Sequence, residues 1–101
     1  MKSDENLTWV IYDISKNKAR RKIVKATEEA GLYRVQKSVF LGSVNRACLD
    51  EMVLKVKEWL NEDTDSLYVF PMCGADFKKI ILLGQAFDKK MVTDDIKSLF
   101  F

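Results

Sequence analysis

The sequence predicts an α+β domain in which helices cover one face of a single mixed β-sheet. Three observations predict it: strand-like and helix-like segments follow one another along the chain, the connections between them are short, and the first three elements run strand, helix, strand. A chain of 101 residues has the length of one domain, which we expect to span residues 1–101.

The first strand is expected at residues 7–13, which are rich in β-branched and aromatic side chains and apolar on both alternating faces, as in a buried central strand. A helix is expected at residues 16–30, because its apolar residues recur at spacings of three and four. Ser15 is expected to cap the start of this helix and Gly31 to end it.

Residues 33–41 are expected to form a strand whose two faces differ. One alternating set is mostly apolar and predicts a buried face. The other set predicts an accessible face that offers a cation, an amide, a hydroxyl and an aromatic ring, on Arg34, Gln36, Ser38 and Phe40. A kink near residues 36–37 would divide the segment into two short strands, and both forms stay open.

Residues 42–45 are expected to form a loop, residues 46–61 an amphipathic helix and residues 61–65 an acidic turn. Further strands are expected at residues 66–70 and 79–83. The resulting order β-α-β-α-β-β favours a ferredoxin-like sandwich.

The sequence ends on an apolar tail at residues 96–101, which should not be left in water. We expect this tail to form a C-terminal strand that packs on a partner subunit, because exchange of a strand is a low-cost route to a dimer.

The composition excludes several kinds of site. The sequence has no histidine, which rules out Ser-His-Asp and Cys-His catalysis and His-ligated zinc. Its two cysteines, Cys48 and Cys73, form no Cys-x-x-Cys pair and favour reduced thiols and a cytoplasmic location. No apolar run approaches the roughly 20 residues of a membrane span, and the polar start is unlike a signal peptide, so we expect no membrane contact.

The net charge of +2 conceals an uneven distribution. Residues 14–46 carry a net charge of +7, whereas residues 47–76 carry −5. This asymmetry predicts a surface that faces a polyanion such as RNA or DNA. A charged helix face that contacts only water explains the same pattern, and charge alone does not separate the two interpretations.

Asp13 is the candidate centre of a site. It is the only acidic residue between Asn6 and Thr27, and it ends the first expected strand, where sites gather in sheets built from strand–helix units. Its carboxylate suits Mg²⁺ or Mn²⁺ bound against a phosphodiester. One carboxylate makes a poor magnesium site, which a second Asp13 from a symmetric dimer would improve. The alternative is that Asp13 pairs with Lys16 or Arg20, or caps the helix.

Basic residues near Asp13 are candidates for phosphate contact. They are Arg20, Arg21, Lys22 and Arg34. A solvated helix face is the alternative for these residues. Ser38 is a further candidate for phosphate contact, and a structural hydroxyl is its alternative.

Three aromatic rings would either stack on bases or lie in the core. The core is favoured for Tyr12 and Tyr33, because aromatic residues at strand spacing usually pack inside. The polar neighbours of Phe40 favour exposure of its ring.

Four stretches of the sequence form a set of motifs. They are Tyr12-Asp13-Ile14-Ser15, Asn17 with the run Lys18-Ala-Arg-Arg-Lys22, Gly31-Leu-Tyr-Arg-Val-Gln-Lys-Ser-Val-Phe-Leu-Gly42, and Asp65-Ser-Leu-Tyr-Val-Phe-Pro71. Together they closely resemble the small CRISPR-associated adaptation protein, a family of CRISPR-associated endoribonucleases that partner the CRISPR spacer integrase. The resemblance extends over residues 7–101. It departs at Lys22, where a basic position that is Arg elsewhere lacks the bidentate fork of Arg.

The resemblance implies a ferredoxin-like homodimer that cleaves RNA or DNA phosphodiesters with a bound divalent metal, Mg²⁺ or Mn²⁺, and assembles with the integrase. It implies that Asp13 holds the metal and that catalysis involves Tyr12, Arg20, Arg34 and Phe40 as well. It also implies a nucleic-acid-binding set consisting of Arg20, Arg21, Lys22, Arg34, Lys37 and Ser38.

Two functions of different classes follow and stay open. The first is a magnesium-dependent endonuclease centred on Asp13. The second is a non-catalytic scaffold whose basic surface holds DNA within the integrase complex. A ribonuclease toxin of similar fold is a more distant alternative.

Overall fold

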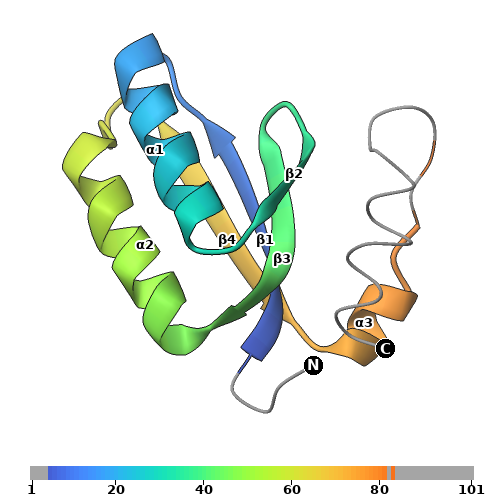
Figure 1. Ribbon diagram of the computed structural model, residues 1–101. Coiled ribbons are helices and arrows are strands. Elements are labelled where there is room, and N and C mark those ends of the chain that lie inside the picture. Colours follow the sequence, from blue (N-terminus) through green and yellow to red (C-terminus); the bar gives the residue numbers. More distant parts are fainter. Residues whose placement is uncertain (1–4, 82, 84–101) are drawn as a thin grey trace.

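The computed structural model describes residues 5–81 and 83. The elements in chain order are β1 (Glu5–Asp13), α1 (Asn17–Glu29), β2 (Tyr33–Gln36), β3 (Val39–Asn45), α2 (Arg46–Trp59), β4 (Ser66–Met72) and the short α3 (Gly74–Lys78). Figure 1 shows α1 and α2 side by side on one face of the sheet. None of the helices in residues 5–81 and 83 has the length and hydropathy of a transmembrane span.

The sheet has the strand order β2-β3-β1-β4, and every neighbouring pair is antiparallel. This arrangement confirms the predicted α+β, ferredoxin-like class. The expectation of a mixed sheet was wrong, because β3 follows β2 in a tight hairpin and lies between β2 and β1, so that the parallel pair β1 and β2 is separated. Strand β1 is therefore paired along both edges, as a buried central strand should be.

The segment 33–41 is a hairpin rather than one strand. A turn at residues 37–38 separates β2 from β3, which confirms the divided form left open by the sequence. Strand β3 continues to Asn45, so the predicted loop at 42–45 was wrong. The reason lies at Gly42, which pairs with Thr8 of β1 and is buried. A Cβ there would lie 2.9 Å from the carbonyl oxygen of Gly31. Gly42 thus permits close packing under the loop that follows α1, and it makes no turn.

The sheet separates two apolar clusters. On the helix side, β1 contributes Val10 and Tyr12 to a cluster that also contains Ile23 of α1, Phe40 of β3 and Met52 of α2. On the opposite face, a second cluster consists of Leu7, Trp9, Val35, Val39, Leu41 and Phe77. The alternation of β1 residues between the two clusters is that of a strand covered on both sides.

The strand predicted at residues 79–83 was also wrong. Residues 74–78 form α3, and residues 79–81 and 83 lie in no regular element. Phe77 and Ile80 are three residues apart, a helical spacing, and both pack against the second cluster. Ile80, which the sequence pattern assigned to a strand, therefore packs on the sheet face, whereas Ile81 and Leu83 of the same predicted strand are exposed. The expected tail at residues 96–101 lies outside the described residues.

The packing at Gly42 predicts the effect of a single methyl group. Gly42→Ala should lower the free energy of unfolding by about 1–3 kcal/mol, because the atoms that the new Cβ meets belong to the Gly31–Leu32 backbone and cannot rotate away. Urea denaturation measures this loss. The exposed control Lys57→Ala should stay within about 0.5 kcal/mol of the parent. A Gly42→Ala protein as stable as the control would contradict the close approach.

Candidate functional site

The end of β1 opens into a hollow of about 390 Å³. Its lining consists of Tyr12, Asp13, Ile14, Arg20, Arg34, Lys37 and Ser38. These residues come from the end of β1, the first turns of α1, strand β2 and the β2–β3 turn. All but Ile14 belong to the site predicted from the sequence, so the fold brings together most of the candidates.

Among the described residues, Asp13 is the only carboxylate that lines this hollow. It pairs through its backbone with Ser66 at the end of β4, and its side chain is exposed. Among the described residues it makes no hydrogen bond or ion pair, so the alternatives in which it pairs with Lys16 or Arg20, or caps α1, do not apply. Strand alternation puts Asp13 on the face of β1 that carries Trp9 and Ile11, opposite the helices.

Arg20 holds the strand end to the helix start. Its Nε and Nη2 donate to the carbonyl oxygen of Ile14 at 3.2 and 2.7 Å, and its Nη1 donates to Oδ1 of Asn17 at 2.9 Å. The guanidinium therefore ties α1 to the residue that follows Asp13, and it still lines the hollow. Only part of its five-donor fork is used, so it can also contact a phosphate.

Tyr12, Arg34 and Phe40 form a stack beneath the hollow. The Tyr12 hydroxyl donates to the carbonyl oxygen of Lys37 at 2.9 Å and accepts from Nη2 of Arg34 at 3.3 Å. The Arg34 guanidinium lies 5.4 Å from the centre of the Phe40 ring, and the Tyr12 and Phe40 rings are 6.1 Å apart. Together these contacts hold the β2–β3 turn against the end of β1.

The exposure predicted for Phe40 was wrong. Its side chain is 0% exposed and Tyr12 is 5% exposed, so the packing leaves no room for a base to stack on Phe40. Phe40 does share a face with Arg34, its cross-strand partner, as the alternation predicted. That face is covered by the helices at the inner strand β3 and open only at the edge strand β2. Arg34 is therefore exposed while Phe40 packs beneath it.

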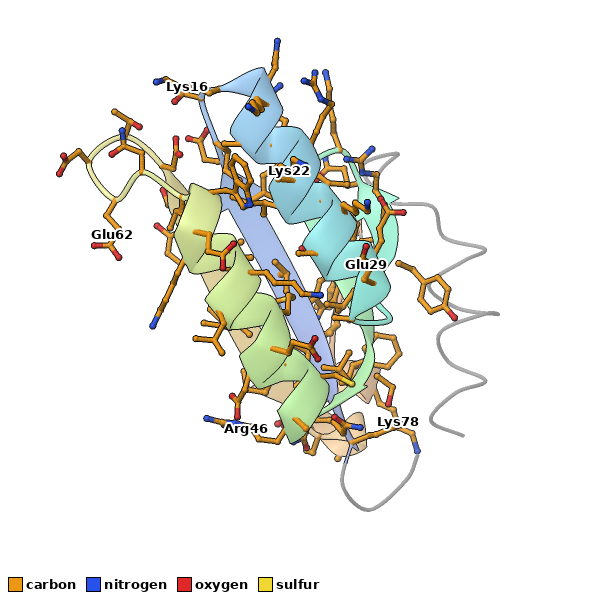
Figure 2. All side chains as sticks on the ribbon, turned by 60° about the vertical axis from the view of Figure 1, so that its left-hand side comes forward. Lys16, Lys22, Glu29, Arg46, Glu62 and Lys78 are labelled. Carbon is orange, nitrogen blue, oxygen red and sulfur yellow. The ribbon has the colours of Figure 1, made fainter. Side chains whose placement is uncertain are left out.

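A second hollow of about 570 Å³ adjoins the first, and the two share Arg20 and Arg34. Its remaining lining consists of Arg21, Val24, Lys25, Glu28 and Glu29 of α1. The predicted basic set therefore divides. Arg21 lies on the β2 side of α1, whereas the ammonium of Lys22 lies 5.4 Å from the Trp59 ring on the α2 side. Figure 2 shows Lys22 on α1, beside α2.

The sequence did not indicate the role of Asp65. Its Oδ1 accepts from the backbone N–H and the hydroxyl of Ser15, both at 3.0 Å, and its Oδ2 accepts from the N–H of Asn61 at 3.1 Å. Ser15 therefore does not cap α1; the N-cap position is Lys16, without a side-chain hydrogen bond. The N–H of Ser15, followed by that of Asn61, lowers the pKa of Asp65. Asp65 thus anchors the chain two residues beyond Asp13.

No group of three or more His, Cys, Asp or Glu side chains that could hold a metal ion occurs within residues 5–81 and 83. Asp13 is the one side chain of these four kinds that lines the hollow among the described residues, so a metal there would need further ligands of another kind. Magnesium is compatible with that, because it is usually held by one or two carboxylates together with water and substrate phosphates.

The Asp65 anchor predicts a pH-dependent contribution to stability. Since the folded pKa lies below the ordinary value of 3.8, the stabilisation is complete above that value and is lost as the pH falls through the folded pKa. Asp65→Asn should therefore melt at a lower temperature than the parent at pH 6, and the difference should narrow below about pH 4. Circular dichroism melts at each pH measure it. Asp63→Asn is the matched control, and an equal pH profile for both variants would refute the anchor.

Comparison with known proteins identifies the family. The family model described as CRISPR associated protein Cas2 matches residues 6–80, from the second residue of β1 to two residues beyond α3. A "CRISPR-associated endoribonuclease Cas2 1" from Methanospirillum hungatei is 34% identical over 79% of this chain and 84% of its own length. A similarly named protein from Archaeoglobus fulgidus is 34% identical over 66% of this chain and 71% of its own length.

Solved structures agree with this match. A hypothetical protein from Thermus thermophilus has a TM-score of 0.69 at 27% identity, covering 80% of this chain and 93% of that one. A crystal structure of a Cas2 protein has a TM-score of 0.68 at 26% identity, covering 81% and 90%. The resemblance inferred from the motifs is confirmed, and the chain belongs to the CRISPR-associated Cas2 family.

Proposed function

We propose that this protein acts in CRISPR adaptation as a homodimer that binds nucleic acid at the end of β1 and cleaves its phosphodiester bonds with the help of a divalent cation. The observation that carries the proposal is the unpaired carboxylate of Asp13 in a hollow lined by Arg20, Arg34 and Lys37. The names of its relatives, CRISPR-associated endoribonucleases, support the reaction class. The spacer integrase is the partner that the family implies.

The cations account for binding. Arg20, Arg34 and Lys37 line the hollow, and Arg21 and Lys25 continue the cations along α1 into the adjoining hollow, where Glu28 and Glu29 follow toward the end of the helix. A phosphodiester backbone following this route exchanges its condensed counterions for side-chain cations, which supplies most of the affinity of a sequence-independent contact. The hydroxyl of Ser38 adds a neutral donor at the same hollow.

Asp13 accounts for the chemistry. The sequence has no histidine, and among the described residues Asp13 supplies the one carboxylate that the hollow offers to a divalent cation. Mg²⁺ or Mn²⁺ held by Asp13 would supply positive charge to a phosphodiester that gains negative charge in the transition state. Arg20 and Arg34 would orient the phosphate, whereas Tyr12 and Phe40 act as positioning residues beneath Arg34.

The sheet face opposite α1 and α2 is the proposed interface of the homodimer. Ile11, Tyr68 and Phe70 lie on this face and are 37%, 55% and 47% exposed, and the rings of Tyr68 and Phe70 stack at 6.1 Å. Apolar side chains gathered in this way favour a covering partner. A second copy is the partner that also answers the shortage of metal ligands, because Asp13 lies on the same face of β1. A two-fold axis there would bring two Asp13 carboxylates together.

The non-catalytic scaffold is the second candidate. It is favoured by the hollow itself, to which the described residues of each chain contribute a single carboxylate. It is also favoured by the hydrogen bonds from Arg20 to Ile14 and Asn17, which give Arg20 a structural role. In this alternative the basic surface holds DNA between integrase subunits, and Asp13 has no chemical role.

Asp13→Asn separates the two candidates. If the protein is a metal-dependent nuclease, cleavage of single-stranded RNA and DNA in Mg²⁺ should fall about 100-fold or more. Binding of the same oligonucleotides should persist, because the cations remain. Gel analysis of cleavage and fluorescence anisotropy measure these two quantities, and Asp63→Asn, an exposed acid of the 61–65 turn, is the matched control.

Cleavage by Asp13→Asn at the parental rate would remove Asp13 from catalysis. If the parent binds the oligonucleotides and supports integrase-dependent spacer acquisition but cleaves neither RNA nor DNA, the scaffold is established instead. If the parent binds neither RNA nor DNA, both the nuclease and the scaffold are overturned.

A substitution that introduces a charge on the sheet face opposite α1 and α2 tests the dimer. Tyr68→Asp should convert the protein to monomers, because it places a carboxylate in the proposed interface. Leu54→Asp is the matched control, since Leu54 is 65% exposed on α2, on the helix side. Sedimentation velocity measures both. Dissociation by Leu54→Asp, or a Tyr68→Asp protein that remains a dimer, would assign the interface to another surface.

A further inference from the structure

Trp59, the last residue of α2, holds two ammonium groups over its ring. The Nζ atoms of Lys18 and Lys22 lie 5.8 and 5.4 Å from the ring centre. The indole is 37% exposed and both lysines are exposed, so the cluster is open to solvent. It lies on the α2 side of α1, away from the hollow at the end of β1.

In the part of the chain that the structure describes, the two lysines have no carboxylate partner. They are four residues apart on α1, where like charges repel, and among the described residues neither makes an ion pair. Lys55 of α2 shows the contrast, because its ammonium lies 3.4 Å from Glu29 and 3.6 Å from Glu51. One part of the α1–α2 surface is thus neutralised by ion pairs, and the Trp59 part keeps two uncompensated positive charges.

The indole ring orients these charges without cancelling them. A ring face attracts a cation through its quadrupole but carries no net charge. Two ammonium groups held near one ring form a site for an anion with several oxygen atoms, and an ammonium is a suitable point charge for phosphate. Glu62, on the loop after α2, points away from α1 in Figure 2.

We propose that Lys18, Lys22 and Trp59 form a second contact for the phosphate backbone of the bound nucleic acid. The proposal rests on the nucleic-acid binding proposed above. Successive residues of a helix are about 100° apart, so Lys18, Arg21, Lys22 and Lys25 share one exposed arc of α1, with Lys22 at its edge near α2 and Arg21 at its edge near β2. A strand that leaves the hollow and crosses the first half of α1 meets both edges of this arc.

The test uses the full chain and a single-stranded oligothymidylate. Binding is followed by anisotropy of a dye on the oligonucleotide over a range of salt concentrations, and separately by the fluorescence of Trp59, which a Trp59→Phe variant distinguishes from that of the buried Trp9. The variant is Lys18→Gln/Lys22→Gln. The matched control is Lys57→Gln/Lys79→Gln, which removes the same charge from exposed positions elsewhere.

We expect the slope of log affinity against log salt to become shallower by about 1.4 in the Lys18→Gln/Lys22→Gln protein, because two single-strand phosphate contacts are lost. The control should keep nearly the parental slope, and oligothymidylate should change the fluorescence of Trp59 in both the parent and the control.

Three results would overturn the proposal. In the first, the Lys18→Gln/Lys22→Gln protein keeps the parental slope of log affinity against log salt, while Arg34→Ala, a change in the hollow, still weakens binding. This result removes the second contact and leaves the proposed function intact. A Trp59 response to tripolyphosphate but not to oligothymidylate assigns the site to a small free phosphate ligand. Absence of oligonucleotide binding in the parent removes the proposed function and this contact together.

Discussion

Strand β1 is hydrogen-bonded along both edges, to β3 and to β4, and this pairing determines where the remaining parts can lie. Its alternate residues belong to the helix-side cluster and to the opposite cluster. This one strand therefore determines which face of the sheet the helices cover. The chain must leave the sheet at Asp13, where the pairing ends. Beyond that point Arg20 holds the carbonyl of Ile14 and Asp65 holds the N–H of Ser15. The carboxylate of Asp13 is thus presented by a backbone fixed on either side, as a functional group requires.

Charge is distributed around this strand end by helix geometry. Helix α1 has a buried face of small and branched residues, and the cations occupy what remains of its circumference. The flank near β2 joins the Asp13 hollow through Arg20 and Arg34, whereas the flank near α2 leads to Trp59. Within the acidic turn 61–65, Asp65 has a structural task, because its carboxylate accepts hydrogen bonds from the backbone N–H groups of Ser15 and Asn61 and so closes the loop.

Periodicity and motif spacing predicted the fold class, the central strand and both long helices, and they placed Asp13 at the end of that strand. They failed where contacts are distant in sequence. Sequence alone made Gly42 a turn glycine, because it does not show that Gly31 packs against it. Sequence alone also made Phe40 an exposed ring, because it does not show that β3 is an inner strand rather than an edge strand. The link from Asp65 to Ser15 spans 50 residues, and no local pattern encodes it. Most of the site was predictable because its residues are local to β1, α1 and the β2–β3 hairpin.

We propose that Asp13 holds the metal ion of a phosphate-binding hollow at the end of β1. Paramagnetic broadening of backbone amide signals by substoichiometric Mn²⁺ tests it most directly, since the ion reports its own position. With Mn²⁺ bound at Asp13, broadening should centre on residues 13–15 and 37–38 and disappear in Asp13→Asn. Broadening centred on the acidic residues 61–65, or broadening unchanged by Asp13→Asn, would contradict it.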